Sequence, residues 1–179
     1  NDYKIVVHML KLGTAKNIMA GGKTRKWPTS ELESYSYWCD RIERSMNPNE
    51  TMMLRIQRMK AMMSYPSKEV YAKKLFDSIT DKCILFANTQ QQAEKLCKHS
   101  YHSENPDSED NLLKFKVGVI SKLSAVLQLN EGVNIPELRQ GIILHAYGNE
   151  RKSSQRIGRL LRLNPNETAV VHILCYEGT

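Results

Sequence analysis

The chain has 179 residues, of which 41% are hydrophobic and 25% charged, and these values are ordinary for one folded domain. No run approaches the roughly 18 consecutive apolar residues of a membrane-spanning helix, which argues against a membrane protein. Lys and Arg number 26 against 19 Asp and Glu, and the resulting charge of +7 favours a polyanionic partner.

The first 81 residues are predicted to form one strand followed by helices. Residues 3–10 are rich in β-branched and apolar side chains, as strands are. A polar, glycine-bearing loop is expected through residue 26, and Pro28 and Ser30 then open a helix. Ser30 and Glu33 have the spacing of a capping box. Helical spacing is found in three segments, which are residues 30–46, 51–63 and 68–79. The methionines of the second segment are expected to fill the core.

From residue 82 onward, short apolar strands alternate with helices. This alternation predicts an α/β fold whose parallel sheet has helices on both faces. Ligands of such sheets bind at the carboxyl ends of the strands, which directs attention to the loops after residues 87, 128 and 146. The expected strands are residues 83–87, 123–128, 142–146 and 169–175, and the expected helices are residues 91–98, 110–117 and 153–163.

Three patterns resemble known functional sites, but each lacks residues that the site would need. Residues 20–24 read AGGKT, but Asn17 stands where a phosphate-binding loop needs its first glycine, so a flexible basic loop is the better interpretation. His99 and His102 lack the further ligands of a metal shell, and no metal site is expected. The four cysteines form no CxxC pair, and reduced thiols are expected.

The most informative stretch is QRIGRLLR at residues 155–162, on a predicted helix. Arg159 and Arg162 are three residues apart and share one helical face with Gln155. Two guanidinium groups and an amide on one face suit a phosphate chain, because Arg binds phosphate bidentately and keeps its charge. The alternative is a solvated basic helix.

The second stretch is LNEGVNIP at residues 129–136, directly after a predicted strand. Its glycine and short polar residues allow a ligand to approach the backbone closely. A plain turn between a strand and a helix explains it about equally well.

Together these stretches resemble the C-terminal RecA-like motor domain of superfamily-two helicases. QRIGRLLR is similar to motif VI of that family, LNEGVNIP to motif V, and CILFANT at residues 83–89 to motif IV. Asn134 stands where motif V usually has Asp. The resemblance is firm over residues 82–179, taken as the RecA-like core, and weaker over residues 1–81, taken as a lead-in strand and helical segment of the same domain. EGVNIP with QRIGRLLR looks closer to DNA translocases than to DEAD-box RNA helicases.

The resemblance implies a motor split across two RecA-like domains, with ATP and Mg²⁺ held mainly by an N-terminal domain outside this chain. Arg159 and Arg162 would be arginine fingers, and Gln155 would help position the nucleotide or the attacking water. Gly132, Asn134, Glu131 and Arg156 would contact the nucleotide, with Gly132 and Asn134 facing the ribose and the domain interface. The residues implied to contact a DNA or RNA backbone are Asn88, Thr89 and Asn130.

Two further functions stay open at this stage. One is a non-catalytic nucleic-acid-binding or scaffold module that keeps the RecA-like fold, and the other is the motor part of a restriction-type nuclease. The chain starts without Met and ends next to a predicted strand, so we expect a fragment of a larger protein that is inactive alone. No signal peptide is recognised, and an intracellular protein, bacterial or phage-encoded or otherwise, is expected.

Overall fold

A computed structural model describes residues 3–126, 135–144, 161–162 and 168–179. Its centre is a six-stranded sheet in the order β1-β10-β8-β4-β6-β5, and every neighbouring pair is parallel. The strands are β1 (Tyr3–Leu10), β4 (Cys83–Ala87), β5 (Ser100–Tyr101), β6 (Lys122–Val126), β8 (Gln140–Ile143) and β10 (Ala169–Tyr176).

Helices cover both faces of this sheet, as the alternation of strands and helices predicts. Along a strand, successive side chains point to opposite faces of the sheet, and each face packs in its own buried cluster. On β4, Ile84 and Phe86 belong to the first cluster and Leu85 to the second. The first cluster includes Phe115 of α5 and the second includes Phe76 of α3. The helices are α3 (Pro66–Ser78), α4 (Gln90–Leu96) and α5 (Ser108–Val117).

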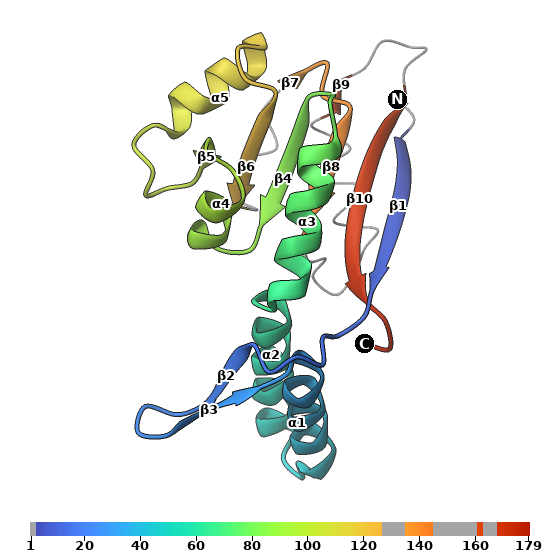
Figure 1. Cartoon of the computed structure of the whole chain (residues 1–179), viewed down its shortest axis with the longest axis vertical. Helices are drawn as coiled ribbons and strands as arrows, with labels where there is room; N and C mark the ends of the chain where they lie inside the picture. Colours follow the sequence, from blue (N-terminus) through green and yellow to red (C-terminus); the bar gives the residue numbers. More distant parts are fainter. Residues whose placement is uncertain (1–2, 127–134, 145–160, 163–167) are drawn as a thin grey trace.

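A smaller part of the molecule lies beyond one end of the sheet (Figure 1). We call residues 11–64 the lead-in lobe, and the six-stranded sheet with α3, α4 and α5 the sheet lobe. The lead-in lobe is a helix pair from which a two-stranded antiparallel hairpin projects. Its elements are β2 (Ile18–Gly21), β3 (Lys26–Thr29), α1 (Glu31–Arg44) and α2 (Pro48–Met63).

Several sequence expectations for the lead-in lobe need correction. The loop expected through residue 26 contains the β2–β3 hairpin, in which Pro28 lies on a strand rather than at a helix start. A two-stranded hairpin has two free edges, so a proline without an N–H is tolerated there. Met52 and Met53 are 56% and 57% exposed, so only part of the methionine-rich helix fills the core.

The cap of α1 follows the predicted spacing in part. Ser30 Oγ accepts a hydrogen bond from the N–H of Glu33 at 3.1 Å. The Glu33 carboxylate accepts from the Ser30 hydroxyl at 3.2 Å instead of reaching back to a backbone N–H. One half of the capping box is therefore formed.

The two lobes are joined at the buried carboxylate of Glu31. It accepts hydrogen bonds from the N–H of Gly13 at 2.8 Å and from the N–H and hydroxyl of Ser67 at 2.9 and 2.6 Å. Ser67 lies in the first turn of α3. The N-cap residue of this helix, Tyr65, makes no side-chain capping bond. Glu31 therefore supplies from another helix the cap that α3 lacks.

The junction continues from Ser67 into the sheet. The Ser67 hydroxyl is 2.6 Å from the Tyr176 hydroxyl at the end of β10. The Lys68 ammonium lies 4.8 Å from the centre of the same ring, and burial lowers the pKa of Lys68 to about 8. A buried polar group is costly when it has no partner. The bonds from Glu31 to Ser67 and from Ser67 to Tyr176 therefore favour one packing of α1, α3 and β10.

Candidate functional site

The carboxyl ends of the central strands lie at one edge of the sheet. Ala87, the last residue of β4, pairs with Val126 of β6, and Phe86 pairs with Ile143 of β8. The chain leaves all three strands at nearly the same level, so the stretches that follow them start side by side. These are the stretches that resemble motif IV, motif V and the approach to motif VI.

Most of the predicted site residues lie outside the described residues. These are Asn130, Glu131, Gly132, Asn134, Gln155, Arg156 and Arg159. The backbone of Arg162 is described, but not its side chain. Asn88 and Thr89 are described in full.

One backbone pairing joins the ends of the motif V and motif VI stretches. β7 (Ile135–Pro136) pairs in parallel with β9 (Leu161–Arg162), with Ile135 opposite Leu161 and Pro136 opposite Arg162. The predicted helix over residues 153–163 is therefore wrong at its end, because Leu161 and Arg162 form a strand. Apolar residues at 157, 160 and 161 have a helical spacing in the sequence, but a local spacing does not register the backbone pairing of 161–162 with β7. The two constellations that carry the family resemblance are thus neighbours at this point.

The turn after β4 is held in place by Gln92, which is buried in α4. Its Oε1 accepts hydrogen bonds from the Asn88 N–H at 2.9 Å and, more weakly, from the Asn88 amide at 3.4 Å. Its Nε2 donates to the carbonyl of Met63 and to Glu69, both at 3.1 Å. Because both ends of the Gln92 amide are used, the turn is tied to α2 and α3.

Asn88 and Thr89 therefore present different groups. The Oδ1 atom of Asn88 is buried and has no partner among the described residues, while its Nδ2 is directed at Gln92. Thr89 is exposed and caps α4, accepting from the N–H of Gln92 at 3.1 Å. A threonine hydroxyl has one donor in addition to its acceptors, so capping leaves the Thr89 O–H able to donate. The geometry suits Thr89 better than Asn88 for a phosphate contact.

Gln92 is a positioning residue that the sequence analysis did not single out. The signal was present, since Thr89 and Gln92 have the T-x-x-Q spacing of a capping box. In such a box the glutamine returns to a backbone N–H near the cap, and here it reaches Asn88, one residue earlier. The prediction that this motif binds a ligand drew attention to Asn88 and Thr89 and away from the side chain that positions them.

A pocket of about 400 Å³ adjoins the same edge, between the ends of β5 and β6. Buried His102 pairs there with Glu94 at 2.8 Å, so this histidine has a structural partner. The described residues contain no group of three His, Cys, Asp or Glu placed to hold a metal ion. The pocket is lined by Gln90, Tyr101, His102, Ser103, Asn105, Pro106, Ser108, Glu109 and Val126.

The AGGKT stretch forms no phosphate-binding loop. Gly21 ends β2 and Lys26 begins β3, so Lys23 and Thr24 lie in the turn of an antiparallel hairpin. A phosphate loop needs a strand, a tight turn and a helix whose N–H groups surround the anion. The expectation of a flexible basic loop is corrected as well, because these residues belong to an antiparallel hairpin.

Comparison with known families gives a match over residues 67–164 to the helicase conserved C-terminal domain. This match covers more than half of the chain and contains all three motif stretches. The chain belongs to this family. It is 29% identical over 100 residues to the DNA 3'-5' translocase XPB2 of Sulfurisphaera tokodaii, a match that covers 52% of this chain and 23% of the relative. The chain thus spans about a quarter of that protein.

Solved structures show the same fold. The SWI2/SNF2 ATPase core of Sulfolobus solfataricus, in complex with dsDNA, aligns with a TM-score of 0.59 at 11% identity, over 82% of this chain and 37% of that one. The C-terminal domain of the DEAD-box protein Dbp5 aligns with a TM-score of 0.50 at 18% identity, over 63% of this chain and 71% of that one. The RecA-like α/β fold is therefore established for this member of the helicase C-terminal family. No helix among its described residues is long and apolar enough to cross a membrane.

Proposed function

We propose that this chain is the second motor domain of an ATP-dependent nucleic-acid helicase or translocase. In this proposal it closes over ATP and Mg²⁺ held on an N-terminal RecA-like domain of the same protein. The observation that carries the proposal is the parallel sheet of a helicase C-terminal domain, in which β4, β6 and β8 end at nearly the same level of one edge. Sites that act on phosphates are built at such edges.

Arg159 and Arg162 are the proposed arginine fingers. A guanidinium placed against the transferring phosphoryl group stabilises its charge and raises the rate by roughly 10³ to 10⁵ in well-studied systems. The pairing of β7 with β9 supports the assignment, because it brings Arg162 next to the end of the motif V stretch. Gln155 would orient the nucleotide or the water, and Glu131, Gly132, Asn134 and Arg156 would line the nucleotide.

DNA is the proposed nucleic acid. The matched relative is named a DNA 3'-5' translocase, and the structure with the better overlap is an ATPase core in complex with dsDNA. Thr89 and Asn130 would contact its backbone phosphates, which positions a strand without reading its sequence. Asn88 shares this assignment through the turn that it forms with Thr89.

The test is steady-state ATP hydrolysis by the full-length protein with DNA or RNA added. We expect hydrolysis to be stimulated by DNA and less by RNA. No stimulation by either nucleic acid would contradict the motor function, and stronger stimulation by RNA would contradict the DNA assignment alone. An intracellular location is part of the same proposal, since both ATP and the nucleic acid are found there.

A further inference from the structure

The positive charge of the chain is concentrated in the lead-in lobe. Residues 11–64 contain ten Lys and Arg and five Asp and Glu, so they carry +5 of the total charge of +7. Within this lobe the stretch from residue 12 to residue 30 has no acidic residue and four basic ones. All four, Lys16, Lys23, Arg25 and Lys26, are exposed on or beside the hairpin.

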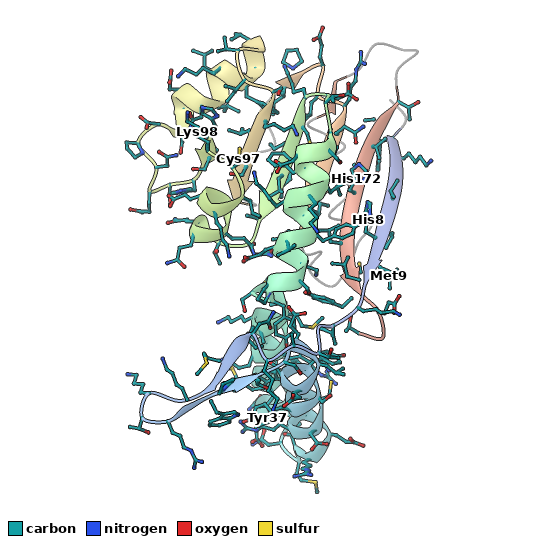
Figure 2. All side chains as sticks on the ribbon, in the orientation of Figure 1. His8, Met9, Tyr37, Cys97, Lys98 and His172 are labelled. Atoms are coloured by element: carbon teal, nitrogen blue, oxygen red, sulfur yellow. The ribbon has the colours of Figure 1, made fainter. Side chains whose placement is uncertain are left out.

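A groove of about 720 Å³ lies between this hairpin and the helix pair. Its walls carry aromatic side chains from both sides. Trp27 of β3 is 50% exposed, and Tyr37 of α1 is 53% exposed. Figure 2 labels Tyr37 on the helix pair. Trp38 lies edge-on to Tyr37 with ring centres 5.1 Å apart, and Tyr65 forms part of the lining. Exposed aromatic rings beside a basic hairpin provide planar surfaces and positive charge together.

The Trp27 ring is held against the hairpin. Gly21, which pairs with Lys26, has a φ of +103°, and a Cβ at this position would lie 2.8 Å from the Trp27 ring and 2.2 Å from the carbonyl oxygen of Arg25. Only glycine fits this close approach. The indole ring therefore packs close to the Gly21 backbone, while half of the Trp27 surface remains exposed.

An acidic side chain also lines the groove. Glu33 accepts a hydrogen bond from the Ser30 hydroxyl, and the Lys16 ammonium lies 4.0 Å from the same carboxylate oxygen. The Glu33 carboxylate would repel a phosphate, so phosphates are expected along the tip of the hairpin and bases along the groove.

The groove and the turn after β4 share a connection. Ser64 and Tyr65 line the groove, while the carbonyl of Met63 accepts the hydrogen bond from Gln92 that helps to fix Asn88. The groove and the motif IV turn therefore both contact the α2–α3 connection.

We propose that the groove between β2–β3 and α1–α2 is a second nucleic-acid site that binds single strands. Unpaired bases would stack on Trp27 and Tyr37, and the backbone would contact Lys23, Arg25 and Lys26. Stacking platforms beside a positive surface bind single strands without sequence preference. Duplex DNA keeps its bases paired and inside the helix, so they cannot stack on these rings. The inference rests on the proposed nucleic-acid partner, but it concerns a lobe outside the family match.

The experiment measures binding of the chain to a fluorescein-labelled oligo(dT) of about 20 nucleotides, which exceeds the roughly 4–16 nucleotides bound by a small single-strand-binding domain. We expect Trp27→Ala to weaken binding about 5- to 100-fold, since stacking on one base accounts for a change of that size. Trp27→Phe should restore part of the affinity. Trp38 is the second of the two tryptophans and also lines the groove, so quenching of the indole fluorescence by oligo(dT) should be reduced in Trp27→Phe.

The charged residues are tested with a matched pair of double variants. Lys23→Gln with Arg25→Gln should weaken binding. The slope of log affinity against log salt concentration should become shallower by about 0.7 for each phosphate that the protein no longer neutralises. Lys98→Gln with Lys116→Gln removes the same charge from the sheet lobe and should leave binding nearly unchanged. Lys98 lies far from the hairpin along the long axis of the molecule (Figure 2).

Three results would overturn the proposal. These are unchanged binding in Trp27→Ala, equal affinity for an abasic strand of the same length, or tighter binding of duplex than of oligo(dT). Each would leave a general electrostatic surface in place of a stacking site. The binding assay contains no ATP, so a negative result would contradict the single-strand site alone. The proposed motor function is tested separately, by ATP hydrolysis in the full-length protein.

Discussion

The two lobes differ in what holds them together and in what they expose. Two buried apolar clusters pack against the sheet, the second of which also includes Met62 of the lead-in lobe. The chain outside residues 11–64 carries a charge of only +2. The lead-in lobe exposes methionines, tyrosine and tryptophan and carries +5. The sheet lobe contains the motif stretches of a helicase C-terminal domain, and the lead-in lobe lies before the match begins at residue 67. Motor function and added contacts are thus assigned to different parts of one chain.

The largest effect is expected when the hydrogen bonds that Glu31 makes between the two lobes are removed. Glu31→Ala empties a buried position and removes the acceptor for the N–H of Gly13 and for the N–H and hydroxyl of Ser67, which are partly buried. We expect the free energy of unfolding to fall by about 3 kcal/mol or more. Urea unfolding measures this.

Glu43→Ala is the control, because Glu43 is exposed on the same helix. It should change stability by no more than about 0.5 kcal/mol. Equal effects of the two variants would show that the Glu31 junction does not hold the lobes together.

Two hydrogen-bonded histidines make the stability of the sheet lobe depend on pH. Tyr71, His8, His172 and Gln140 form a chain of hydrogen bonds of 2.6, 2.9 and 2.7 Å across α3, β1, β10 and β8. If Nε2 of His172 donates to Gln140, its Nδ1 accepts from His8, and Nδ1 of His8 accepts from Tyr71, so both rings are neutral. Figure 2 shows the two histidines side by side on adjacent strands.

Burial lowers the pKa of His8, and burial together with the His8 charge lowers the pKa of His172 to about 4. Between pH 6.5 and about pH 4, His172 is protonated in the unfolded chain but remains neutral in the folded chain. Stability should therefore be full above about pH 6.5 and decline as the pH falls toward 4, by about 1–2 kcal/mol for this partly exposed ring. In His172→Gln the decline in urea midpoint between about pH 7 and about pH 4.5 should be smaller, and an unchanged decline would refute the assignment.

The hairpin offers a pair of neighbouring glycines with opposite expectations. Gly21→Ala places a methyl group into the Arg25 carbonyl and the Trp27 ring, and it strains a backbone with positive φ. We expect a local cost of about 1–2 kcal/mol, seen as altered Trp27 fluorescence and weaker oligo(dT) binding. Gly22→Ala meets nothing within 4 Å and should change neither quantity. Similar effects of both variants would mean that the close packing of Trp27 is unimportant.

The smallest effect is expected at Thr89. Thr89→Ala removes the cap of α4 and should cost about 1 kcal/mol of stability, while Thr89→Ser keeps the hydroxyl and should cost little. Thermal unfolding measures both. If the hydroxyl also contacts DNA, Thr89→Ala weakens DNA binding and Thr89→Ser does not.

Much of the sheet lobe was predictable because its signals are local. Five apolar residues at 83–87 specify a buried strand whatever surrounds them, and the alternation with helices specifies parallel pairing. The β2–β3 hairpin was not predicted because GGKTRK shows no apolar alternation, and its second strand contains Pro28. The cap of α3 by Glu31 was not predicted because it joins residues 36 positions apart.

The candidate site divides in the same way. The motif stretches and their order were readable, and the family match confirms what they indicate about the fold. The roles of single residues depend on contacts between distant segments. Gln92 reaching Met63 and Glu69, and Arg162 opposite Pro136, follow from tertiary packing that no local pattern contains.

The most direct test of the motor assignment is single-turnover ATP hydrolysis by the full-length protein bound to DNA. Arg159→Ala should slow the chemical step by roughly 10³-fold or more while nucleotide binding is largely kept, since a finger acts on the transition state. Arg151→Ala removes a basic residue four positions before the motif VI stretch that has no proposed role, and this variant should hydrolyse ATP at close to the normal rate. Equal rates for Arg159→Ala and the unaltered protein would contradict the account.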